Sequence, residues 1–281
     1  MRTLPAVSLA LLFAVTACAA GDPQMADMED PGGDSADGED PLADMIKAKY
    51  GVRPRRYVGL LNQSNEAEKR FVGTMPMVTA FLNDLASRHS TPFSMHEAEL
   101  MVNFITEGGF FVLDGDQIDG IDGFGSLGID TLVDNYAALK PWLHQSIRDA
   151  IESGDRVVEN INELGQKVKS LTDLTIEEGM WANAGMFAWS RATLAADLAS
   201  RGTPLASLPQ EGQFFWTTVY FNAGPGTGRK MLDKNGVRFF EKKWLKADDA
   251  NQFSQSAQFN ALWRTASFEY LLKAAFPSKG A

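Results

Sequence analysis

Apolar residues recur at helical spacing along most of the chain that follows residue 44. The clearest stripe comprises Leu100, Met101, Phe104 and Ile105, which share one face of a helix with 3.6 residues per turn. Similar stripes recur further along, whereas the alternating pattern of strands is weak. The sequence predicts helices over residues 95–107, 176–200, 211–222 and 255–276.

Polar residues mark the ends of two of these helices. Ser94 followed by Glu97 has the spacing of a capping box. Thr175 is a suitable N-cap for the helix over 176–200, Glu178 suits its positive end, and Gly202 is expected to stop it. Together with the weak strand signals, these features predict an α-dominated fold with at most a small β element.

The start of the chain differs from the rest. Arg2 precedes an apolar run over residues 4–15 that is too short to span a bilayer, which is typical of a secretory signal. The motif VTAC, which ends at Cys18, resembles the lipobox of bacterial lipoproteins, in which the cysteine is lipidated. An ordinary cleaved signal is the alternative. Because Ala19 follows the cysteine, resemblance to Gram-negative sorting signals implies the periplasmic face of the outer membrane.

Residues 19–44 are rich in Asp, Gly, Ala and Pro and contain no aromatic residue, Lys or Arg. Such a segment cannot bury enough apolar surface to fold, so we expect a disordered tether with a reach of roughly 25–30 Å. It carries most of the net charge of −10, and the near-neutral remainder gives no indication of nucleic-acid binding. The predicted organisation is a signal peptide over 1–17, the lipidated Cys18 and tether over 18–44, and one globular domain over 45–281.

The stretch YFNAGPGTGRK, residues 220–230, invites comparison with a phosphate-binding loop. A P-loop requires GxxxxGK[ST] between a strand and a helix, but Arg229 follows Gly228 and the preceding segment has a helical pattern. The three histidines, His89, His96 and His144, lack the spacing of zinc ligands. Neither a metal nor a cofactor is implied.

Glu107 places a carboxyl group on the apolar face of the helix over 95–107. It follows Phe104 by three residues and Leu100 by seven, and it lies in the last turn. Partial burial and the negative end of the helix dipole both favour the neutral acid, which is the form that a general acid requires. A glutamate whose head group reaches water at a helix end is the alternative.

Three stretches together resemble the goose-type-lysozyme-like, or soluble, lytic transglycosylases. FITEGGF, which contains Glu107, is similar to the family's E-S-G-F signature, and FNAGPG at 221–226 is similar to A-Y-N-A-G-P-G. Between them, GFGSLGI at 123–129 stands in the place of G-x-x-G-L-M-Q. The resemblance covers about residues 90–240 and implies a lysozyme-like domain. The chain departs from the family at Gly108 (Ser in the family), Phe221 (Tyr) and Gly128 (Gln).

This resemblance implies a peptidoglycan lytic transglycosylase that cleaves between N-acetylmuramic acid and N-acetylglucosamine and forms a 1,6-anhydro product. Glu107 would act first as general acid and then as base. The resemblance also implies a set of substrate-binding residues, Asn222, Tyr220, Phe221, Gly125 and Ser126. Trp142 and the loop residues 110–111 are further candidates for a cleft wall.

Three alternatives stay open at this stage, and one of them is a helical envelope protein unrelated to this family. In a muramidase, Asp116, Asp119 or Asp122 would hold a water opposite Glu107, with carboxyl groups about 6.5 to 9.5 Å apart. A protein of another class would be a non-catalytic peptidoglycan-binding or scaffolding lipoprotein with a lysozyme-like fold, which the three departures from the family favour. Calcium binding by the acidic loop over 114–122 is a separate possibility.

Overall fold

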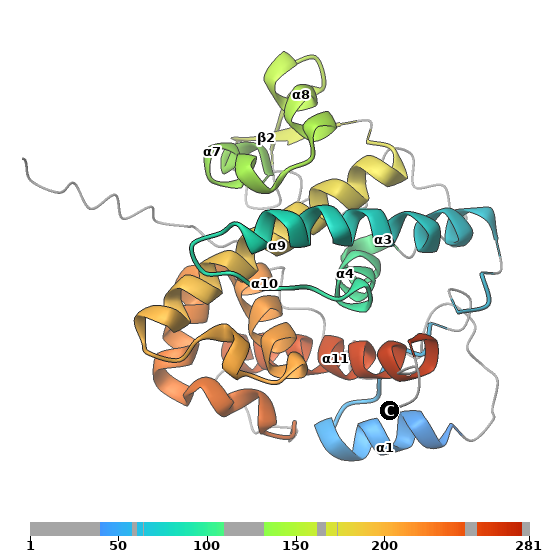
Figure 1. Ribbon diagram of the computed structural model, residues 1–281, viewed down its shortest axis with the longest axis vertical. Helices are drawn as coiled ribbons and strands as arrows, with labels where there is room; N and C mark the ends of the chain where they lie inside the picture. Colours follow the sequence, from blue (N-terminus) through green and yellow to red (C-terminus); the bar gives the residue numbers. More distant parts are fainter. Residues whose placement is uncertain are drawn as a thin grey trace, which may run out of the picture.

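Helices dominate the computed structural model, which describes residues 40–57, 61–63, 65–109, 132–161, 167–172, 174–244 and 252–276 (Figure 1). In chain order, the helices are α1 (Pro41–Tyr50), α3 (Glu66–Ser87), α4 (Glu97–Phe104), α7 (Tyr136–Leu139), α8 (Gln145–Ser153), α9 (Ile176–Ser200), α10 (Gln210–Asn235) and α11 (Gln252–Ala275). A π-helical turn (Ile105–Gly109) follows α4, and short 3-10 turns are Lys140–Trp142, Leu205–Ser207 and Val237–Glu241. The α-dominated fold predicted from the sequence is confirmed.

The short helix α4 lies at the centre of the packing. It contacts α3, α9 and α11, and Figure 1 shows it between α3 and α11. Leu100, Val102 and Phe104 are buried on its different faces, so that the helix is enclosed along its length. Helix α10 packs against both α9 and α11 and completes the core. The C-terminal end of α4, which immediately precedes the turn with Glu107, therefore lies inside the domain.

Helix α9 begins and ends as its sequence predicts. Thr175 is its N-cap and forms a reciprocal capping box with Glu178, and Gly202 follows its last turn with a positive φ of 73°. The start of α4 differs from the prediction. His96, and not Ser94, is the N-cap and forms a capping box with Glu99, and the backbone carbonyl of Ser94 accepts a hydrogen bond from the side chain of Arg191.

Helix α10 contains a sharp break where the sequence predicted a helix end. Gly224 has φ 73° and ψ 158°, a conformation that favours glycine, and Pro225 then starts a second helical stretch. Beyond the break, Gly228 packs against the ring of Tyr220, where an added Cβ would lie 2.5 Å from the ring atoms. Two glycines of the GPGTG stretch therefore serve the bend and its packing.

Helices α1 and α3 were not predicted. Pro41–Asp44, assigned to the tether, form the first turn of α1, because Asp40 caps the helix and accepts a 2.8 Å hydrogen bond from Tyr270 of α11. Helix α3 begins at a capping box of Asn65 and Glu68. Its buried positions have the spacing of one helical face: Phe71, Met75, Val78, Leu82 and Ala86.

A β-hairpin lies beside α7 and α8, at the top of Figure 1. Strands β1 (Val157–Ile161) and β2 (Lys167–Leu171) are antiparallel, with Val157 opposite Leu171 and Glu159 opposite Lys169. The hairpin confirms the small β element. Within the described ranges, no helix is both long and apolar enough to cross a bilayer.

Candidate active site

Glu107 lies in the wide turn that follows α4. The backbone over Ile105–Gly109 is π-helical, and the Thr106 hydroxyl donates a 2.6 Å hydrogen bond to the carbonyl of Val102. Single π-helical turns are rare and frequently occur at functional sites. The Glu107 side chain is 15% exposed, so its carboxylate is largely buried and still reachable from the surface.

Arg264 of α11 contacts this carboxylate. Its Nη2 donates to Oε1 of Glu107, and its Nη1 donates to Oδ1 of Asn103 at 2.9 Å. Asn103 in turn donates through Nδ2 to Oδ1 of Asn183 at 2.9 Å. Asn103, Asn183 and Arg264 are all buried. A buried polar chain therefore runs from α9 through α4 to α11 and ends on Glu107.

Asn222 reaches the same helix. Its Nδ2 donates to Oδ1 of Asn260 at 3.0 Å, and Asn260 precedes Arg264 by one helical turn. Residues four apart on a helix have Cβ atoms about 5–6 Å from each other. Glu107 and Asn222, which are far apart in the sequence, thus contact consecutive turns on one face of α11.

Arg264 is the charged neighbour of Glu107. Its guanidinium is in direct contact with the Glu107 carboxylate, and the two side chains form an ion pair. In the part of the chain that the structure describes, Arg264 is the sole hydrogen-bond partner of the Glu107 side chain.

Tyr220, a predicted substrate-binding residue, lies in the core of the domain. Its side chain is fully buried, its hydroxyl donates to Asp197 at 2.9 Å, and burial raises the pKa of Tyr220. Phe221 lies on another side of α10, where its ring meets that of Phe187 edge-on. Of this predicted trio, Asn222 is the residue whose side chain hydrogen-bonds α11, the helix that carries Arg264.

Trp142 was expected in a cleft wall and is instead part of the core. Its side chain is 6% exposed and stacks against Phe93 with ring centroids 5.6 Å apart. The remaining candidates lie outside the described residues: Cys18, Asp116, Asp119, Asp122, Gly125 and Ser126, together with the acidic loop over 114–122 and residues 110–111. His96 and His144 cap α4 and α8, and no metal-binding group of His, Cys, Asp and Glu occurs among the described residues.

Tyr57 is a further buried residue beside this site. Its backbone φ is 54°, which is unusual for a residue with a side chain, and burial raises the pKa of Tyr57. Thr106, Arg264 and Ser267 lie near its hydroxyl. Among the described residues, however, that hydroxyl has no partner with hydrogen-bond geometry. Nothing in the local sequence of Tyr57 indicates this position.

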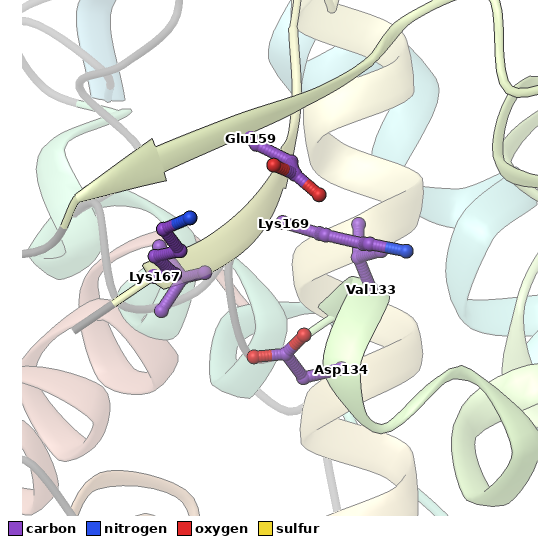
Figure 2. Close-up of a pocket in the computed structure, with 6 residues that line it drawn as sticks. Val133, Asp134, Glu159, Lys167 and Lys169 are labelled. Atoms are coloured by element: carbon purple, nitrogen blue, oxygen red, sulfur yellow. The ribbon is translucent and has the colours of Figure 1, made fainter.

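A cavity of about 340 Å³ lies elsewhere, beside the β-hairpin (Figure 2). It is lined by Val133, Asp134, Glu159, Lys167, Val168 and Lys169. Figure 2 shows charged groups of both signs around it, from the two strands and from the segment that carries Asp134. None of its lining residues belongs to the polar chain that ends on Glu107.

Comparisons of the chain with protein-family models, curated proteins and solved structures return no match.

Proposed function

We propose that the protein cleaves the glycan strands of peptidoglycan as a lytic transglycosylase, with Glu107 as its acid and base. The observation that carries the proposal is that Glu107 and Asn222 contact consecutive turns of α11 through Arg264 and Asn260. Both residues belong to the motifs on which the resemblance rests. Their convergence in the interior supports a shared site.

In the proposed reaction, Glu107 donates its proton to the glycosidic oxygen while the bond from that oxygen to C1 of the muramoyl residue breaks. The bonding electrons leave with the N-acetylglucosamine oxygen. The resulting carboxylate then accepts the proton of the muramoyl C6 hydroxyl, whose oxygen attacks C1 and closes a 1,6-anhydro ring. Glu107 ends protonated and no water is consumed, so one carboxyl group suffices, unlike the pair used by most glycosidases.

The proposed location remains the periplasmic face of the outer membrane, with a lipid anchor at Cys18 and peptidoglycan as the partner. These proposals rest on the sequence motifs, because residues 1–39 lie outside the described part of the chain. The described domain begins at α1, with Asp40 as its N-cap. About 20 residues would then separate the anchor from the domain, a reach of roughly 25 Å for a flexible chain.

A second candidate is a peptidoglycan-binding protein without catalysis. It is favoured by the contact between Arg264 and Glu107, because buried arginine–glutamate pairs also occur in purely structural positions. Phe221, in place of the family's tyrosine, favours it as well, since a phenyl ring cannot donate a hydrogen bond.

The test is a digest of purified peptidoglycan by the full-length chain in detergent, with released muropeptides identified by mass. Glu107→Gln is the test variant. Glu97→Gln, in the first turn of α4, is the matched control. Anhydro products from wild type and control, and none from Glu107→Gln, are expected. Hydrated reducing ends would identify a muramidase, and retained wall binding without products would identify the binding protein.

A further inference from the structure

Two buried Arg–Glu pairs in this domain differ in how completely they are satisfied. Arg191 and Glu99 have side chains 0% and 1% exposed, and the guanidinium bonds both carboxylate oxygens, at 2.8 and 3.2 Å. Arg191 Nε also donates to Thr217 at 2.9 Å. All three guanidinium nitrogens of Arg191 and both carboxylate oxygens of Glu99 are hydrogen-bonded, as expected of a structural ion pair.

The pair of Arg264 and Glu107 is incomplete by comparison. Within the described ranges, Oε2 of Glu107 has no hydrogen-bond partner, and Nε of Arg264 is buried without one. Buried polar atoms in native proteins are nearly always paired, so the unpaired Nε of Arg264 needs an explanation. The unequal use of the two carboxylate oxygens is the feature that separates this pair from the structural one.

We propose that Arg264 is the positioning residue of the site: it fixes Oε1 of Glu107 and leaves Oε2 as the oxygen that exchanges the proton with substrate. This assignment rests on the proposed function. In the reaction written above, Oε2 gives its proton to the glycosidic oxygen and later takes the proton of the C6 hydroxyl. Oε1 stays bonded to the guanidinium in both steps, and the positive charge stabilises the carboxylate that exists between them.

The orientation of the Arg264 guanidinium is itself fixed by hydrogen bonds to buried residues of neighbouring helices. Asn103 and Glu107 lie four residues apart. The planar guanidinium donates to Asn103 through Nη1 and to Glu107 through Nη2. Asn103 is held by Asn183, so that the guanidinium plane is set by α4 and α9 together. A lysine retains the charge but has no fork, and therefore cannot hold both partners in one plane.

The test measures kcat and KM of the full-length chain on soluble, uncross-linked peptidoglycan strands. Arg264→Met is expected to lower kcat on the order of 100-fold, the loss typical of a catalytic group misplaced by about 1 Å, with little change in KM. Arg264→Lys is expected to recover part of that loss because the charge returns. Arg191→Lys, in the satisfied pair, is the matched control and is expected to reduce stability while kcat per folded molecule stays at the wild-type value.

Two further arms keep the assignment testable if Arg264→Met does not fold. Arg264→Lys removes the paired Nη donors of the guanidinium, and Asn183→Ala removes the hydrogen bond that holds Asn103. A lowered kcat in both variants supports the assignment. Wild-type kcat in both, or in a folded Arg264→Met, overturns it while the proposed function stands. An inactive wild type overturns the proposed function and this assignment together.

Discussion

Asn260 and Arg264 lie one turn apart on α11, and they bond Asn222 and Glu107 respectively. Helix α11 is thus the element that joins two motifs from distant parts of the sequence. Its own residues lie beyond the region in which the lytic transglycosylase resemblance was found. The C-terminal helix is therefore part of the candidate site as well as part of the core.

The glycines after the break in α10 have different roles, which predicts opposite effects of alanine. Gly228→Ala would place a Cβ 2.5 Å from the buried ring of Tyr220, whose hydroxyl is tied to Asp197. Relieving such a clash typically costs about 1–3 kcal/mol. We expect the free energy of unfolding, measured by chemical denaturation, to fall by that amount.

Gly226→Ala is the matched control two residues earlier. Nothing lies within 4 Å of a Cβ built there, and its backbone is helical. Alanine restricts the unfolded chain and favours the helix, so stability should stay equal or rise by up to about 1 kcal/mol. Equal losses in both variants would contradict the packing role assigned to Gly228.

Adjacent threonines of α10 provide a second matched pair. Thr217 accepts a 2.9 Å hydrogen bond from Arg191 Nε and donates to the carbonyl of Gln213. Thr218 is equally buried, but within the described part of the chain its hydroxyl has no partner. Valine has nearly the same shape as threonine.

Thr217→Val is expected to lower the free energy of unfolding by roughly 1.5–3 kcal/mol, the range for a hydrogen bond to a charged group. Thr218→Val should be neutral or stabilising, because it removes a buried hydroxyl that is not compensated. Urea denaturation of both variants checks the difference. A larger loss for Thr218→Val than for Thr217→Val would refute the hydrogen-bond assignment.

Glu269 couples α11 to α1 in a pH-dependent way. Burial opposes its ionisation, but hydrogen bonds from Lys273, Lys49 and Tyr50 outweigh burial and lower the pKa of Glu269 to about 2, from an ordinary 4.5. A lowered pKa in the folded state stabilises the fold above the unfolded value of 4.5. That contribution disappears as the pH falls from about 4.5 to about 2.

The expected contribution is at most about 3 kcal/mol at neutral pH. Wild type should therefore exceed Glu269→Gln in the free energy of unfolding at pH 6, and this difference should shrink steadily below pH 4.5. Denaturant titrations at a series of pH values measure it. Glu66→Gln removes an exposed ion pair and should change little at any pH. A difference for Glu269→Gln that is constant down to pH 3 would rule out this role.

Local signals predicted much of the fold. Helix α9 was found with its cap because Thr175, Glu178 and the apolar pattern agree with one another. Helix α3 was missed although its buried positions from Phe71 to Ala86 have clear helical spacing. Helix α1 was missed because its first turn is as acidic as the preceding segment, and its order comes from contacts with α11 that local sequence does not encode.

The site was predicted only where a motif named its residues. Glu107 and Asn222 came from short motifs, whereas Arg264 and Asn260 have no motif of their own. One available signal was the position of Arg264, which lies next to Trp263 and near other apolar residues on a predicted helix. A charged residue is buried among apolar positions only when it is paired, so this pattern indicates that Arg264 has a partner. Which carboxylate pairs with it depends on tertiary packing between α4 and α11.

The most direct test of the central claim is the initial rate at which the full-length chain releases 1,6-anhydro muropeptides from purified peptidoglycan. We expect release by wild type and by Glu97→Gln, and loss of release in Glu107→Gln with the fold intact by circular dichroism. Equal release by wild type and Glu107→Gln, or no release by folded wild type, would contradict it.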